Sequence, residues 1–254
     1  MMNGLESLMY EKSLITLDNE NTMFKRRYVL RFGLWKAVKH LWSTGRWERL
    51  DNIIDLYRNY KNDNSEEVTN LLMKVARGMD ASEVNDFGMG LGKNIRRTAI
   101  YFLERYDDRK RTLLTRDPYM IARHTLSAME DIGIPFHEYV TSDAVVEDGR
   151  ITGELGLRVS DGVRGKLGTV SEHYNPPRTS EDKLWWYEFL VEDVFRIGYD
   201  EALYVHDNGK HEQDIIKKHS RNQISMNDLD VLMKPYMPSR IDDIKYASRY
   251  FSRL

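Results

Sequence analysis

Short apolar runs that end abruptly at polar or acidic residues recur along the chain. The run SLITL, 13–17, is too short for a helix and is rich in aliphatic and β-branched residues, so it predicts a buried strand. The polar cluster DNEN, 18–21, follows it and favours a turn, because short polar side chains compete for backbone hydrogen bonds. Two carboxylates, Asp18 and Glu20, are therefore expected at the carboxyl end of a buried strand.

The same pattern continues in the second half of the chain. We expect strands at 111–116, 137–142, 201–206 and 223–227, and a hairpin around the turn residues Asp148 and Gly149. We expect helices at 119–131 with Asp117 as its N-cap, at 182–197 with Thr179 or Ser180 as its cap, around Ile215 and Ile216, and after Ser239. Strands that alternate with helices predict an α/β fold with a mostly parallel sheet covered on both faces.

Between the first two strands the apolar spacing changes to threes and fours, as in LWKAVKHLW, 34–42. This spacing is typical of amphipathic helices. The helical block is too long for a simple crossover between parallel strands, so it predicts an inserted domain. We therefore expect an α/β core, 1–24 and 108–254, and a helical insert, 25–107.

One glycine-rich segment, FGMGLGKN at 87–94, superficially suggests a phosphate-binding loop. Its spacing does not match a P-loop, no clear strand precedes it, and Lys93 is not followed by serine or threonine. We interpret the segment as a hinge or a connection between helices.

The composition, 41% hydrophobic and 31% charged residues, is typical of a soluble globular protein. A net charge of −2 gives no support for nonspecific nucleic-acid binding. The absence of cysteine excludes disulfides, thiolate metal sites and cysteine nucleophiles, so a metal would be held by oxygen or imidazole. No run approaches the roughly 18 to 20 apolar residues that span a bilayer, and the N-terminal segment lacks the order of a signal peptide. We expect a cytoplasmic protein without a membrane partner.

Three predicted strand ends carry candidate chemistry: Asp18 with Glu20, Thr115, and Asp207 with Glu212. A lysine opens the helix before the last of these, and a helical insert follows the first. In this order the chain resembles the haloacid dehalogenase (HAD) superfamily, most closely its phosphoserine-phosphatase-like branch. The resemblance covers nearly the whole chain up to about Asn227 and implies a Rossmann-like core with a helical cap that closes over the active site.

The family's first motif has an aspartate nucleophile, any residue, a second aspartate, any residue, then threonine or valine. Here Asp18 and Thr22 match it, and Glu20 takes the second acidic position. For the lysine of the third motif, Lys183 fits best, because it begins a helix about one helix-and-strand length before the last motif. Lys166 is the competitor.

The resemblance also implies roles for these residues. Asp18 would attack phosphorus and form an aspartyl phosphate. A Mg²⁺ ion would be held directly by Asp18 and Asp207 and by the backbone carbonyl of Glu20, with Glu212 acting through water.

The remaining roles concern the phosphate and the proton. Thr115, the Arg116 backbone N–H and Lys183 would hold the phosphate. Glu20 would protonate the leaving alkoxide and then deprotonate water. Because glutamate adds one methylene to the usual aspartate, the proton donor shifts, and misplacement on that scale can cost about a hundredfold in rate.

Other polar residues have weaker signals. His206 and His211 suggest a histidine-metal site, but we interpret them as solvated loop residues, since no third imidazole lies nearby in sequence. Five basic residues of the insert are candidates for contact with an anionic end of the substrate: Arg26, Arg27, Arg31, Lys36 and Arg46.

Our first hypothesis is a Mg²⁺-dependent phosphatase that hydrolyses a small phosphorylated metabolite, a phosphomonoester. The second is a catalytically degenerate relative that binds a phosphorylated ligand or a protein partner without turnover. Glu20 and the unusual segment HDNGKHEQD, 206–214, motivate this hypothesis. A third, nucleic-acid binding through the aromatic and basic helices of the insert, lacks a recognised motif and a strongly basic face.

Overall fold

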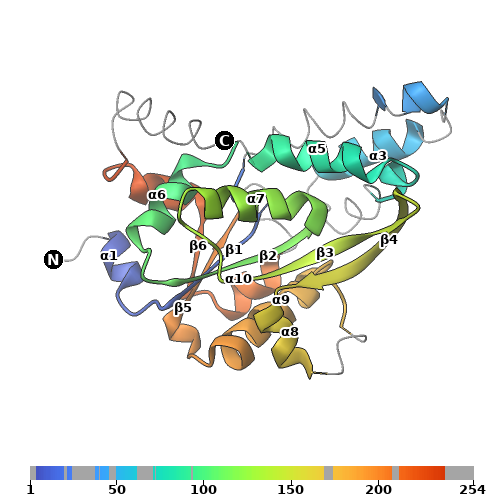
Figure 1. Ribbon diagram of the computed structural model, residues 1–254. Coiled ribbons are helices and arrows are strands. Elements are labelled where there is room, and N and C mark those ends of the chain that lie inside the picture. The colour runs from blue at the N-terminus through green and yellow to red at the C-terminus, as the bar shows by residue number, and fades with distance from the viewer. Residues whose placement is uncertain are drawn as a thin grey trace.

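In the computed structural model of the chain, six strands form one sheet in the order β4-β3-β2-β1-β5-β6 (Figure 1). The strands are β1 (Leu14–Leu17), β2 (Lys110–Pro118), β3 (Glu138–Glu147), β4 (Arg150–Val159), β5 (Ala202–His206) and β6 (Gln223–Ser225). All neighbours pair in parallel except β3 and β4, which form an antiparallel hairpin. The structure describes residues 4–19, 22–24, 38–39, 41–45, 50–61, 71, 73–92, 94–168, 174–207 and 212–237.

The strand β1 lies at the centre of the sheet because its sequence is apolar on both faces. All four of its residues are buried, and it pairs with β2 on one side and with β5 on the other. Parallel strands buried on both faces have such continuous apolar runs. The predicted α/β architecture with a mostly parallel sheet is therefore confirmed.

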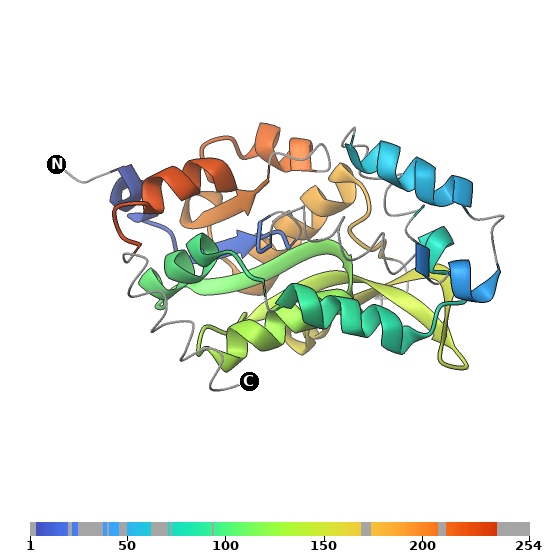
Figure 2. The same ribbon diagram turned by 90° about the horizontal axis from the view of Figure 1, so that it is seen from above.

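Helices cover both faces of this sheet (Figures 1 and 2). One layer contains α1 (Gly4–Met9), α6 (Arg97–Arg105), α7 (Tyr119–Asp131) and α11 (Met226–Met233), which share a buried apolar cluster with β1 and β5. The other layer contains α8 (Asp161–Leu167), α9 (Ser180–Phe189) and α10 (Gln213–Lys218), which share a second cluster. A π-helical turn, Leu190–Phe195, continues α9, and a 3₁₀ turn, Tyr199–Glu201, leads into β5.

The segment between β1 and β2 contains α3 (Leu50–Lys61), α5 (Ala81–Gly92) and α6. Its two ends meet: the Arg96 N–H donates to the Met23 carbonyl oxygen at 2.6 Å, and Phe24 bridges to Ile95. The chain thus leaves and re-enters the core at one place, as expected of an insert. The domain division at 107 stays a prediction, and within the predicted insert α6 packs into the same apolar cluster as β1.

Two predicted boundaries were wrong. Asp117 is not the cap of α7, because β2 runs on to Pro118, and the Asp117 carboxylate accepts a hydrogen bond from Asn19 instead. The last predicted strand ends at Ser225, whose side chain caps α11 by accepting from the Asp228 N–H at 3.1 Å. The helix expected after Ser239 lies outside the described residues.

The glycine-rich segment 87–94 was also wrongly predicted as a hinge or connection, since α5 continues through it to Gly92. Its glycines allow α5 to lie against α7 (Figure 2). A Cβ atom on Gly88 would lie 2.6 Å from the His124 ring and one on Gly92 2.8 Å from the His124 carbonyl oxygen. Only glycine permits so close an approach of two backbones.

None of the helices in the described part of the chain combines the length and the apolar character needed to cross a bilayer.

Candidate active site

Three predicted site segments meet at the carboxyl ends of adjacent strands. Asp18 follows β1, Asp207 follows β5, and Glu212 precedes α10. Carboxylate oxygens of these three residues all lie within 4.8 Å of one another. In open α/β sheets this edge is where ligands bind.

A buried lysine from the helical layer of α8, α9 and α10 contacts the acidic cluster. The Nζ atom of Lys183, on α9, lies 3.0 Å from Oδ1 of Asp18 and 3.5 Å from Oε1 of Glu212. The start of α9 is fixed by a capping box, in which Thr179 and Asp182 exchange hydrogen bonds between side chain and backbone. The competing lysine, Lys166, is exposed on α8.

Glu212 is fully buried and accepts hydrogen bonds at both carboxylate oxygens. Oε1 accepts from the Tyr204 hydroxyl at 2.7 Å, and Oε2 accepts from the Asp207 N–H at 3.1 Å. Burial raises the pKa of Glu212 well above its usual range, and the nearby Lys183 charge opposes that shift. Burial and the Glu212 and Asp18 charges also raise the pKa of Tyr204, so the phenol keeps its proton.

The end of β2 brings a hydroxyl and a further acid to the site. Thr115 is buried, and its Oγ1 accepts from the Asp117 N–H at 3.1 Å, a bond that leaves the hydroxyl hydrogen for another acceptor. Arg116 between them is also buried. The Asp117 carboxylate accepts from Asn19 Nδ2 at 2.7 Å, which ties the loop after β1 to the end of β2.

Asp117 was missed as a site residue, because an acid before proline at a strand end has an ordinary explanation as a helix cap. Burial, followed by the charge of Asp18, raises the pKa of Asp117 to about 6, while the Asn19 hydrogen bond opposes the shift. The sequence signal that could have identified Asp117 is its position two residues after Thr115, the hydroxyl residue predicted to contact the phosphate.

Several predicted residues lie outside the described part of the chain: Glu20, His211, Arg26, Arg27, Arg31, Lys36 and Arg46. His206 is described, and the expectation that it is solvated was wrong. It is buried at the end of β5, where its Nε2 contacts Oε1 of Gln223, and burial lowers its pKa.

The acidic cluster suits a hard divalent cation. Its three carboxylates offer only oxygen ligands, as Mg²⁺ prefers. Lys183 contacts two of them, and when all three are ionised its single positive charge does not balance them in a largely buried site. The side chains of Asp18, Asp207 and Glu212 therefore fit a bound Mg²⁺ ion.

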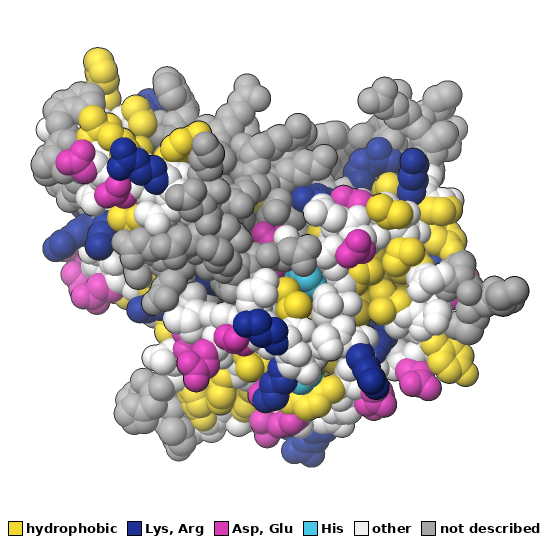
Figure 3. Space-filling model, turned by 180° about the vertical axis from the view of Figure 1, so that it is seen from behind, with side chains coloured by type: hydrophobic (Ala, Val, Ile, Leu, Met, Phe, Trp, Pro, Cys, Tyr) yellow, Lys and Arg dark blue, Asp and Glu magenta, His cyan; other side chains and the backbone are white. Residues whose placement is uncertain are grey.

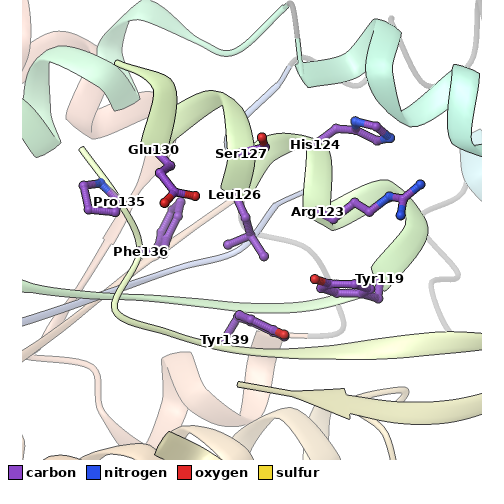
Figure 4. A pocket seen from close by; sticks show the side chains of 9 residues that line it. All are labelled: Tyr119, Arg123, His124, Leu126, Ser127, Glu130, Pro135, Phe136 and Tyr139. Atoms are coloured by element: carbon purple, nitrogen blue, oxygen red, sulfur yellow. The ribbon is translucent and has the colours of Figure 1, made fainter. Parts of the chain in front are cut away.

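A cavity of about 490 Å³ lies apart from this cluster along α7 (Figure 4). Its lining includes the stacked rings of Tyr119 and Tyr139, together with Phe136, Arg123 and Glu130. The cavity lining contains neither the acids of the cluster nor Lys183, so it is separate from the candidate active site.

The face shown in Figure 3 bears on the nucleic-acid alternative. Basic and acidic side chains of the described residues lie interspersed there, with hydrophobic side chains between them. A single basic patch is the usual electrostatic footprint of a nucleic-acid-binding protein. The described residues of this face form no such basic patch.

No protein-family model and no curated protein matches the sequence. Among solved structures, the chain is similar to a substrate-bound phosphoserine phosphatase, with a TM-score of 0.56 and 12% identity over 84% of this chain and 85% of that one. A phospho-aspartyl intermediate analogue of phosphoserine phosphatase gives a TM-score of 0.52 at 12% identity, over 82% and 83%. A HAD family hydrolase from Salmonella enterica serovar Typhi gives 0.52 at 9% identity, over 83% and 66%.

The chain has the HAD fold. The predicted resemblance is thus confirmed at the level of the fold, and the neighbours named phosphoserine phosphatase agree with the predicted branch. In this HAD fold, Asp18 and Asp207 directly follow the adjacent strands β1 and β5, and Thr115 lies three residues before the end of β2, which pairs with β1 on its other side.

Proposed function

We propose that the protein is a Mg²⁺-dependent phosphatase that hydrolyses a small phosphomonoester through an aspartyl phosphate on Asp18. The observation that carries this proposal is the convergence of Asp18, Asp207, Glu212 and Lys183 at one edge of a HAD-type sheet. One of the similar structures is named a phospho-aspartyl intermediate analogue, which supports the same chemistry here.

The reaction has two displacements at phosphorus. In the first, an Asp18 carboxylate oxygen forms a bond to phosphorus while the bond to the leaving alkoxide breaks, and Glu20 gives the alkoxide its proton. In the second, Glu20 takes a proton from water as that water attacks phosphorus. The aspartyl–phosphorus bond breaks, which releases inorganic phosphate and restores Asp18.

Lys183 lowers the electrostatic cost of the first step. The nucleophile and the phosphate are both anions, and they repel each other on approach. The ammonium group 3.0 Å from Asp18 offsets part of that repulsion, and the burial of both side chains strengthens the effect.

The end of β2 holds the phosphate. The Thr115 hydroxyl donates to one phosphate oxygen, and the Arg116 backbone N–H donates to another near the start of α7. A small displacement of the phosphate would misalign its phosphorus with the Asp18 oxygen, and misplacement of reacting atoms can lower the rate about a hundredfold.

The metal would be held by the side chains of Asp18 and Asp207, by the Glu20 carbonyl oxygen and, through water, by Glu212. When bound, Mg²⁺ supplies positive charge that neutralises the phosphate oxygens during the displacement.

A second candidate function is binding of a phosphorylated ligand without turnover. Two features favour it: glutamate at position 20, and the Asp117 carboxylate, which interacts with the charge of Asp18 and would repel a phosphate there when it is ionised. In this case Lys183 and Thr115 would bind the phosphate, and the site would lack a competent proton donor for turnover.

Hydrolysis of p-nitrophenyl phosphate and a broad panel of phosphomonoesters, with and without Mg²⁺, separates the two candidates. We expect metal-dependent hydrolysis that Asp18→Asn abolishes. The matched control is Asp131→Asn, which changes an exposed acid at the end of α7 and leaves activity intact. Folded wild-type protein that binds Mg²⁺ but hydrolyses nothing in the panel would establish the binder instead.

A further inference from the structure

Tyr204 is a polar residue at a position where packing alone requires only an apolar one. It lies in the middle of β5, a strand buried along its whole length, and its ring packs in the apolar cluster of α8, α9 and α10. A buried hydroxyl is costly unless it forms a hydrogen bond. The Tyr204 hydroxyl forms one, to Oε1 of Glu212 at 2.7 Å.

This bond completes the fixation of the Glu212 carboxylate. Oε1 faces both the Tyr204 hydroxyl and, at 3.5 Å, the Lys183 ammonium, while Oε2 accepts from the Asp207 N–H at 3.1 Å. With both oxygens held, the carboxylate cannot rotate without breaking a hydrogen bond. These bonds keep a Glu212 carboxylate oxygen within 4.8 Å of the carboxylate oxygens of Asp18 and Asp207.

The same bond affects how Lys183 is shared. The Lys183 Nζ atom lies closer to Asp18, at 3.0 Å, than to Glu212, at 3.5 Å. The Tyr204 hydroxyl donates a hydrogen bond to Oε1, so the Glu212 carboxylate depends less on Lys183 for its stabilisation. Without it, Glu212 would draw Lys183 away from the Asp18 oxygen.

We propose that Tyr204 is a positioning residue of the candidate active site, which orients Glu212 toward the cation position and leaves Lys183 to Asp18. This inference rests on the proposed metal-dependent function. In this role Tyr204 acts through its hydrogen bond to Glu212. Residues that orient metal ligands in this way are worth about 10- to 100-fold in metal affinity or activity.

The chain offers a matched control in Tyr187. Its ring lies in the same cluster, 5.3 Å from the ring of Tyr204, and both side chains are fully buried. Within the described residues, however, the Tyr187 hydroxyl has no hydrogen-bond partner. Tyr187→Phe and Tyr204→Phe thus remove the same atom from the same core, and only the second removes a bond to Glu212.

The experiment is a calorimetric titration of Mg²⁺ into each full-length variant without substrate, with thermal unfolding as the check on folding. We expect Tyr204→Phe to bind Mg²⁺ about tenfold more weakly than the wild type, and Tyr187→Phe to bind it equally well. In a Glu212→Gln background, adding Tyr204→Phe should cause little further loss, because the two residues act as one unit.

Unchanged Mg²⁺ affinity in folded Tyr204→Phe would overturn the inference, as would losses that simply add in the double variant. These outcomes are distinct from failure of the proposed function. A wild type that binds Mg²⁺ without turnover, and loses affinity in Tyr204→Phe, overturns the phosphatase and supports the positioning role. A wild type that binds no Mg²⁺ overturns both.

Discussion

The Nζ atom of Lys183 lies 3.0 Å from Oδ1 of Asp18, and neither side chain is more than 2% exposed. Burying such a pair costs desolvation energy that packing with apolar residues would avoid. The pair also joins two layers of the fold, since Lys183 comes from α9 and Asp18 from the end of β1. A costly contact at the centre of an acidic cluster is better explained by the proposed phosphate chemistry than by stability alone.

Replacing Lys183 by methionine should therefore reduce both activity and stability. We expect at least a hundredfold loss of p-nitrophenyl phosphate hydrolysis, because the Asp18 nucleophile and the phosphate lose their shared cation. Stability, measured by urea unfolding without Mg²⁺, should fall by about 3 kcal/mol, since a buried carboxylate loses its partner. Lys166→Met is the control: its side chain is exposed on α8, and we expect a change within about 0.5 kcal/mol. Similar losses in the two variants would refute the assignment of Lys183.

Mg²⁺ should stabilise the wild-type protein through the acidic cluster. A ligand that binds only the folded state adds about 2.7 kcal/mol at a concentration one hundred times its Kd. We expect thermal unfolding to shift upward with Mg²⁺ in the wild type and in Asp131→Asn, and to shift much less in Asp207→Asn. An equal Mg²⁺-dependent shift in all three proteins would place the ion elsewhere.

Asp117 should make the metal-free protein less stable as the pH rises. Its folded pKa of about 6 exceeds the ordinary value of 3.8, so between these values the folded state binds the proton more tightly than the unfolded state. Asp117 therefore contributes to the free energy of unfolding below about pH 4, and this contribution is lost as the pH rises to about 6. After allowance for the partial exposure of the side chain, the loss is about 2 kcal/mol. Asp117→Asn keeps an oxygen to accept from Asn19 and should flatten this pH dependence of urea unfolding. If Asp131→Asn flattens it equally, Asp117 is not the group responsible.

The strand ends of the site were predictable because each depends on local sequence. An apolar run that stops at an acid specifies both a buried strand and a polar turn, as at Leu17 and Asp18 or His206 and Asp207. The lysine followed from its position at the start of a helix. Its approach to Asp18 depends on packing between layers that the sequence does not encode locally.

Features that depend on a distant partner were not predictable. Asp117 has the sequence context of a helix cap, yet its side chain accepts a hydrogen bond from Asn19, which is distant in the sequence. Tyr204 has the context of a packed core residue, and its proposed role depends on the position of Glu212, which lies eight residues further along the chain. The same limit explains the error in the glycine-rich segment, where glycine was interpreted as a break because the packing of α7 against this segment could not be predicted.

That segment gives a prediction with an internal control. In a helix interior alanine is favoured over glycine by about 1 kcal/mol. Gly90→Ala should therefore stabilise the protein, since among the described residues no atom beyond the local backbone of α5 lies within 4 Å of the added Cβ. Gly88→Ala should instead destabilise it by about 1 to 3 kcal/mol, because the added Cβ would lie 2.9 Å from the Met120 carbonyl oxygen as well as against His124. Urea unfolding of both variants measures the difference. Equal gains in stability would mean that α5 does not lie against α7 in solution.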